Sequence, residues 1–213
     1  MKTDEFVAML ARGNTRVAPR TVEHRFVVGI GLGTVVSSVL LAGTLDIRVD
    51  LVAALGLPMF WVKLGFAASL MLASLMAVLR LSRPGMPVGR TPGAVATPIA
   101  ALWLLALATL FATAPDQRLA AVFGATWMVC PWLIAMLALP VFGGIMWALA
   151  GLAPTRLRTA GATAGLLSGA TAVLIYSLHC PEMAAPFIAT WYVLGMALPT
   201  ALGALLGPRL LRW

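Results

Sequence analysis

Six long apolar stretches constrain what this chain can fold into. Each offers about 20 mostly apolar residues, the length that an α-helix needs to cross the hydrocarbon core of a bilayer. None of them alternates apolar and polar residues with a period of two, so a transmembrane β-barrel is not expected. The stretches cover residues 26–45, 60–79, 95–113, 131–152, 160–178 and 185–206.

The composition supports a membrane protein. Of the 213 residues, 61% are hydrophobic and 10% are charged, whereas a soluble domain carries about 25% charged residues. Such a chain has too little polar surface to cover a globule in water. The sequence therefore predicts an all-α, polytopic membrane protein with a bundle of six transmembrane helices. Residues 1–25 are expected to form a separate cytoplasmic segment, and residues 26–213 the transmembrane domain.

The start of the fourth span depends on Pro131. Residues 119–152 carry no charge, and this stretch is too long for one straight span and too short for two spans with a turn. Proline is tolerated in the first turn of a helix and is costly inside it. We therefore expect the span to begin at Pro131, after an interfacial approach over residues 119–130.

The basic residues predict the orientation. The six spans divide the 15 Lys and Arg residues into twelve on one side and three on the other, which are Arg48, Lys63 and Arg118. The positive-inside rule places the richer side, with both termini, in the cytoplasm. Lys63 is expected to reach the interface from its helix end. The net charge of +8 is thus explained by membrane topology. It does not indicate nucleic-acid binding, which needs a continuous basic face interleaved with aromatics.

Two pairs of glycines are spaced for close helix packing. Gly29 and Gly33 lie in the first span, and Gly203 and Gly207 lie in the last. Small residues four positions apart let helix backbones approach closely. The favoured interpretation is packing within the bundle, and a homodimer interface is the alternative.

The cytoplasmic segment is too short to have a core. Apolar residues between Phe6 and Leu10 recur at roughly helical spacing after Thr3 and Asp4, the candidate helix caps. Gly13, Asn14 and Pro19 then interrupt the pattern. This indicates a short amphipathic helix followed by a linker. The helix either lies on the membrane surface or binds a partner and orders on contact.

The two cysteines are the main candidates for chemistry. Cys130 and Cys180 are each followed by a proline, Pro131 and Pro181, and both are expected at the extracytoplasmic surface. Two thiols at one membrane level in an oxidising compartment can form a disulfide, or they can hold a soft metal ion. A proline in the first turn would place each cysteine at a helix N-terminus, where free N–H groups favour the thiolate.

The neighbours of the cysteines are expected to support this site. His179 would add an imidazole as a metal ligand or proton acceptor, and Pro131, Pro181 and Glu182 are the other residues expected to support the site. The alternative is that both cysteines are inert small residues of an apolar interior. We favour a sensing or redox role because both lie in the same sequence context and on the same side.

Enzymatic functions are not expected. Two cysteines are too few to relay electrons in a disulfide-generating oxidoreductase, and His24 and His179 fall on opposite sides, which excludes a bis-histidine haem. The spans contain almost no charge at their centres, where transporters commonly keep functional acids or bases. No constitutive cofactor is predicted. A small carrier remains as an alternative, as does a structural membrane partner without thiol sensing.

Several strings resemble NrsF-type proteins, which are bacterial inner-membrane anti-sigma factors. The resemblance covers nearly the whole chain; the His-Cys-Pro-Glu string is its most specific part, and the N-terminal segment is its least specific. The strings are Leu-His-Cys-Pro-Glu-Met (178–183), Trp-Tyr-Val-Leu-Gly-Met-Ala-Leu-Pro (191–199), Leu-Gly-Pro-Arg-Leu-Leu-Arg-Trp (206–213), Val-Cys-Pro-Trp (129–132) and Phe-Trp-Val-Lys-Leu (60–64).

The resemblance implies a function and a location. A multi-pass protein of the bacterial inner membrane would hold an extracytoplasmic-function sigma factor inactive, without contacting nucleic acid itself. Cys130 and Cys180, with a transient heavy-metal ion or an oxidant, would sense stress. Residues 1–25 would bind the sigma factor, with help from the loop 80–94. The residues expected to make this contact are Asp4, Phe6, Leu10, Arg12 and Arg16.

Overall fold

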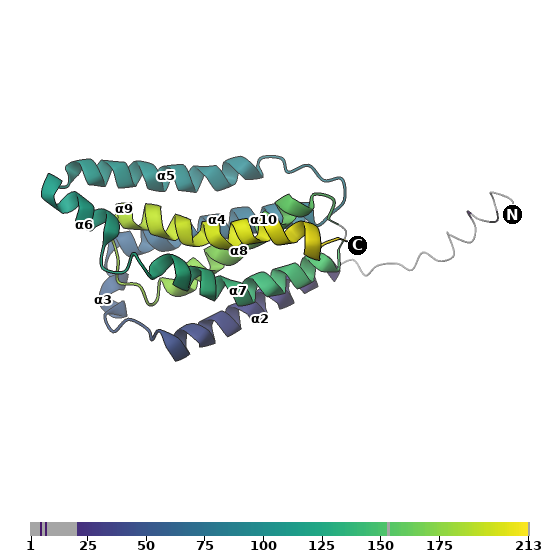
Figure 1. The fold of residues 1–213 in the computed structure, drawn as a ribbon, viewed down its shortest axis with the longest axis horizontal. Helices are drawn as coiled ribbons and strands as arrows, with labels where there is room; N and C mark the ends of the chain where they lie inside the picture. The colour runs from purple at the N-terminus through teal and green to yellow at the C-terminus, as the bar shows by residue number, and fades with distance from the viewer. Residues whose placement is uncertain (1–4, 6, 8–20, 153, 213) are drawn as a thin grey trace.

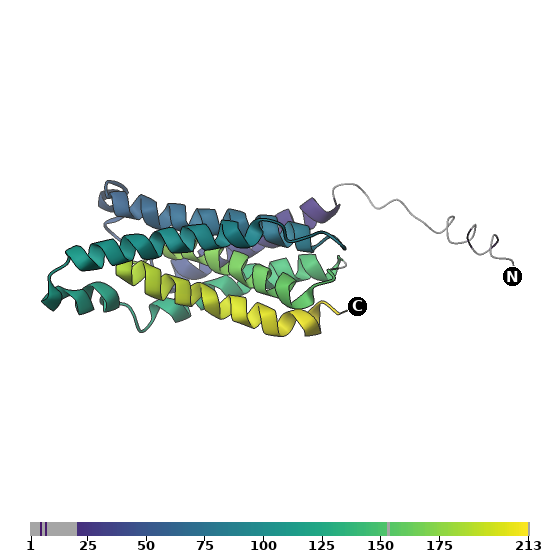
Figure 2. The ribbon, with the colours of Figure 1, turned by 90° about the horizontal axis from the view of Figure 1, so that it is seen from above.

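The protein is a bundle of six long helices that run along one common axis (Figures 1 and 2). The computed structural model describes residues 5, 7, 21–152 and 154–212. All six helices are long and apolar enough to cross a membrane, which confirms the predicted all-α, polytopic class. The first five are α2 (Thr21–Thr44), α4 (Pro58–Leu81), α5 (Thr91–Ala112), α7 (Cys130–Ala150) and α8 (Leu157–Tyr176).

The sixth span is continuous but changes its helical pitch. It starts as α9 (Ala185–Phe187), passes through a π-helical turn η2 (Ile188–Tyr192) and continues as α10 (Val193–Leu210). Such π turns occur mostly as single turns inside α-helices, and often beside functional sites.

The first described residues of α2 and the last of α10 lie at the same end of the bundle (Figure 1), which we call the terminal end. The opposite end contains both cysteines, and we call it the cysteine end. Three short helices lie there: α3 (Leu51–Leu55), η1 (Pro115–Gln117) and α6 (Arg118–Phe123). Helix α6 overlaps the first residues of the predicted interfacial approach, 119–130.

Helix α2 begins earlier than the sequence predicted. It starts at Thr21 rather than at residue 26, so it takes in the last residues of the predicted cytoplasmic segment. Arg25 stabilises this extension, because its guanidinium donates a hydrogen bond to Gly151 O at 3.3 Å and lies 5.0 Å from the centre of the Trp147 ring. The amphipathic helix predicted before Pro19 falls outside the described residues, apart from Glu5 and Val7.

Helix α8 is the centre of the bundle, where it packs against α4, α7 and α10. It is the least hydropathic of the six spans and the most buried. Both properties follow from its small residues, because glycine, alanine and serine let the neighbouring helices approach. Its buried hydroxyls bond to its own backbone, as Ser168 does to Gly165 O at 2.8 Å. Helix α5, by contrast, lies along one edge of the bundle (Figure 1).

The predicted glycine pairs pack within the chain. Gly29 faces Gly144 of α7, and Gly203 faces Gly161 of α8. In each pair a Cβ on either residue would overlap the partner's backbone carbonyl. Ser37 strengthens the contact between α2 and α7 with a buried hydrogen bond to Leu137 O at 2.7 Å. These glycines therefore allow close packing between helices of the same chain, which was the favoured interpretation.

We expect Gly161→Ala to destabilise the protein by about 1–3 kcal/mol, the range for overpacking a tight contact. The matched control is Gly143→Ala in α7, where no atom lies within 4 Å of the added Cβ. The control should keep or raise stability, because alanine is the better helix former. Thermal unfolding in nanodiscs compares the two variants, and equal melting temperatures would contradict the packing described above.

The orientation of the bundle remains a prediction, and reporter fusions test it. Alkaline phosphatase fused after Asp116, at the cysteine end, should be active in a bacterial host, because the enzyme needs an oxidising compartment to form its disulfides. The same enzyme fused after Gly85, at the terminal end, should be inactive. The opposite pattern would place the termini outside the cytoplasm.

Candidate functional site: a buried thiol pair

Cys130 lies where the sequence placed it. It is the first residue of α7, with Pro131 in the first turn, because that position needs no N–H donor. The backbone N–H of Cys130 donates to Thr126 O at 2.9 Å, so the turn before the helix is continuous with its start. The side chain points into the core and is fully buried.

Cys180 does not begin a helix, which corrects the sequence interpretation. Helix α9 begins at Ala185, with Pro186 in its first turn. Cys180 and Pro181 therefore belong to a non-helical connection, residues 177–184, between α8 and α9. Pro186 rather than Pro181 takes the position in the first helical turn, so the helix-terminus argument for a thiolate does not apply to Cys180.

The fold brings the two sulfurs together as free thiols. The Cys130 thiol lies within hydrogen-bonding distance of the Cys180 sulfur. Tyr176 and Tyr192 border the pair, and both rings are almost completely buried. The Tyr192 hydroxyl faces Cys180, but it has no well-aligned hydrogen-bond partner among the described residues.

The surroundings of Cys180 favour its thiolate. The hydrogen bond from Cys130 has the largest effect and, together with the positive charge of Lys63 and the N–H of Glu182, lowers the pKa of the Cys180 thiol to about 5, although burial acts in the opposite direction. These surroundings favour a pair in which the Cys180 sulfur accepts a hydrogen bond from the Cys130 thiol. A thiolate is the form that attacks oxidants and binds metals.

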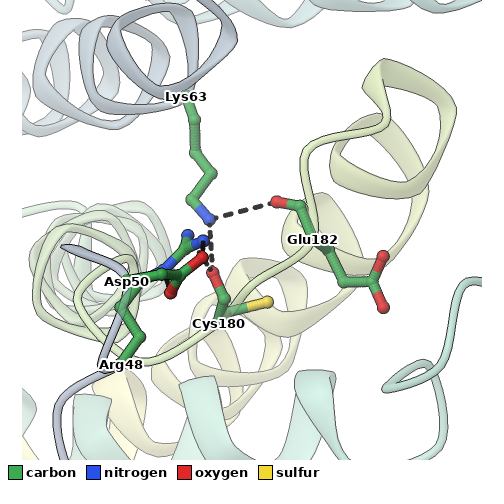
Figure 3. Close-up of polar contacts among 5 residues, drawn as sticks. All are labelled: Arg48, Asp50, Lys63, Cys180 and Glu182. Atoms are coloured by element: carbon green, nitrogen blue, oxygen red, sulfur yellow. Dashed lines mark hydrogen bonds and ion pairs between the residues drawn. The ribbon is translucent and has the colours of Figure 1, made fainter. Parts of the chain in front are cut away.

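Lys63 lies inside the bundle next to this pair, although the sequence predicted that it would extend to the interface. Its side chain is 0% exposed. Nζ donates to Cys180 O at 3.1 Å and to Glu182 O at 3.3 Å (Figure 3), and it lies 5.2 Å from the centre of the Tyr192 ring. In the described part of the chain its ammonium has no carboxylate within ion-pair distance.

Arg48 holds the connection from a second direction. The backbone N–H of Arg48 donates to Leu178 O at 3.0 Å, and its guanidinium donates to Cys180 O at 3.3 Å. The same guanidinium forms a two-point ion pair with Asp50, with distances of 2.7 and 2.6 Å. This ion pair raises the pKa of Arg48 and lowers the pKa of Asp50.

Glu182 turns its carboxylate away from Lys63 (Figure 3). Oε1 accepts the N–H of Ala125 at 2.8 Å and lies 3.5 Å from the Thr126 hydroxyl. The turn that receives it begins at Gly124, whose φ of +53° favours glycine. A Cβ at Gly124 would overlap the carboxylate, so glycine is needed there for two reasons.

Of the other predicted supporting residues, His179 lies away from the sulfurs. Its Nδ1 is 2.9 Å from Asp46 O. Pro131 is buried and Pro181 is exposed. Across the residues that the structure describes, no group of three or more His, Cys, Asp or Glu side chains is arranged to hold a metal ion.

The donor set therefore consists of two sulfurs, which suit a soft metal ion but are fewer than the four ligands of a structural zinc site. His179 is not placed as the third ligand that the sequence suggested.

Sequence reasoning missed Lys63 and the two tyrosines as parts of the site. A signal was available, because Lys63 is a lone charge near the end of an apolar span. The sequence also contains only two tyrosines, and both lie against the thiol pair.

The fold and the site define a class: a polytopic membrane protein of six helices with a pair of free thiols buried at one end. Comparison with known families is more specific. The family model described as "Negative regulator of sigma F" (NrsF) matches residues 10–213, and the chain belongs to this NrsF family.

Two curated relatives match over 100% of both chains. One is the "Probable anti-sigma-F factor NrsF" of Azospira oryzae, with 48% identity, and the other is the "Anti-sigma-F factor NrsF" of Caulobacter vibrioides, with 38% identity. No solved structure matches the chain significantly.

The hydrogen bond from Cys130 gives a testable pH dependence. We expect Cys130→Ala to raise the pKa of Cys180 towards its ordinary value, because the main group that stabilises the thiolate is lost. The ultraviolet absorbance of the thiolate would then appear at a higher pH than in the wild type, with a Cys130→Ala/Cys180→Ala double variant as the blank. Cys130→Ser, which keeps a donor, should shift less. An unchanged midpoint in Cys130→Ala would show that Cys130 does not determine the pKa.

Proposed function

We propose that this protein is a membrane-bound anti-sigma factor of the bacterial inner membrane. It would hold an extracytoplasmic-function sigma factor inactive at the terminal end and release it when stress acts on Cys130 and Cys180. Membership of the NrsF family supports the anti-sigma role. The observation that best supports the sensing role is the contact between two buried thiols, in which the surroundings of Cys180 favour its thiolate.

Helices α2 and α7 provide a route between the two ends. Helix α7 runs from Cys130 to the terminal end, where Gly151 O accepts the hydrogen bond of Arg25 in α2. The Gly29–Gly144 contact and the Ser37 hydrogen bond hold these helices together between the ends. A shift of α7 at Cys130 would therefore move the start of α2, which leads directly into the proposed sigma-binding segment.

The terminal end also offers a surface from the loop 80–94. A groove of about 330 Å³ opens between α2 and α4 and combines apolar residues with two arginines. Its lining residues are Val22, Glu23, Met76, Leu79, Arg80, Arg83 and Met86. Such a groove suits an amphipathic helix with acidic residues. This agrees with a contribution of the loop to sigma binding alongside the N-terminal segment.

Release requires that the modified and unmodified thiol pairs favour different packings of the bundle. A ligand or a chemical change shifts a conformational equilibrium only by the difference in its free energy between the two states. A chemical change at the thiol pair can supply such a difference in free energy, because it alters the charge at a buried position. A disulfide or a bound soft metal would remove the thiolate that now lies beside the buried ammonium of Lys63.

The direct test replaces both cysteines. Cys130→Ser/Cys180→Ser should insert normally and keep the sigma factor inactive, but it should no longer induce sigma-dependent transcription under heavy-metal or oxidative stress. A transcriptional reporter and an immunoblot of the membrane fraction measure the two properties. Normal induction in the double variant would eliminate thiol sensing. Normal repression after deletion of residues 1–20 would eliminate the N-terminal segment as the sigma-binding element.

A further inference from the structure

We propose that Lys63 and Glu182 are positioning residues that hold the sulfurs of Cys130 and Cys180 together. The inference rests on the proposed function in that it names the residues on which the sensing pair depends. Lys63 contacts the connection that contains Cys180 from α4, and Glu182 joins the same connection to the turn before α7.

The connection needs contacts from outside, because it is not part of a helix. Its first half is joined to the loop after α2 by Arg48 and His179. Lys63 binds the carbonyls on both sides of Pro181, those of Cys180 and Glu182. A single fully buried ammonium thus fixes the backbone on both sides of that proline. Hydrogen bonds from a charged donor are stronger than those between neutral groups.

Glu182 holds the other side. Its carboxylate accepts the N–H of Ala125 in a turn whose glycine leaves room for it. The next residue of that turn, Thr126, accepts the N–H of Cys130 at its carbonyl. One carboxylate therefore joins the segment of Cys180 to the first turn of α7, and the two sulfurs are brought together by a short series of hydrogen bonds.

Trp191 adds a parallel contact that does not pass through the cysteines. Its Nε1 donates to Val122 O at 2.8 Å, and its ring packs against those of Phe123 and Trp127. This keeps α6 beside the sixth span even if the contact of Glu182 is lost. Removal of Glu182 should therefore loosen the sulfur pair without unfolding this end of the bundle.

Disulfide formation by diamide separates positioning from reactivity. One thiolate first adds to the N=N bond of diamide, which then takes up a proton. The second thiolate attacks the sulfur of this adduct, the S–S bond forms, and the reduced hydrazine leaves with both electrons and a second proton. Only the second step needs both sulfurs in contact, so a positioning residue acts on that step.

The experiment uses the full chain in nanodiscs, with acid quenching and intact mass to count adduct and disulfide. Glu182→Ala and Lys63→Met should slow the second step about 10- to 100-fold, the loss typical of misplaced reacting groups. Glu182→Gln keeps an oxygen acceptor for Ala125 and should retain most of the wild-type rate. Asp116→Ala, an exposed acid at the same end, is the control and should match the wild type.

Wild-type second-step rates in both Glu182→Ala and Lys63→Met would overturn the proposal. So would an equally severe loss in Glu182→Gln, because a hydrogen-bond acceptor would then not be the relevant feature. If Lys63→Met does not fold, the two Glu182 variants decide alone. The diamide measurement involves no sigma factor, so it can reject the positioning role without rejecting thiol sensing. The serine variants, in turn, can reject thiol sensing without rejecting the positioning role.

Discussion

Buried backbone groups must find hydrogen-bond partners within the protein, and in the connection that contains Cys180, residues 177–184, side chains rather than a helix supply them. Two basic side chains, Lys63 and Arg48, donate hydrogen bonds to its carbonyl oxygens. The same arrangement places positive charge beside the Cys180 sulfur. The side chains that satisfy these backbone carbonyls thus also favour a thiolate inside an apolar core, where an unpaired charge would be costly.

The rest of the bundle makes this local chemistry relevant at a distance. Small residues on α2, α7, α8 and α10 bring backbones into contact between the middle of the bundle and the terminal end. Closely packed helices transmit displacement because they have little room to deform. Under the proposed function, a chemical event at the cysteine end would reach the terminal end as a change in how α7 lies against α2.

The sequence predicted the architecture well and the details of the site less well. Six apolar runs are long enough to be unambiguous, and Pro131 fixed the start of the fourth span because proline fits only a few helical positions. Cys180–Pro181 was misleading because the same argument applies to Pro186, and only three-dimensional packing chooses between two nearby prolines. Lys63 was misplaced because a lysine near a helix end can point outward or inward, and its partners are carbonyls distant in the chain.

The central claim is that the state of the thiols at one end sets the affinity for a protein at the other end. The most direct measurement is the dissociation constant of the cognate sigma factor for the reconstituted protein, with Cys130 and Cys180 either as thiols or as a disulfide. Coupling between distant sites is typically worth 5- to 150-fold in affinity, and we predict weaker binding to the disulfide form within that range. Equal affinities for the two forms would contradict the account.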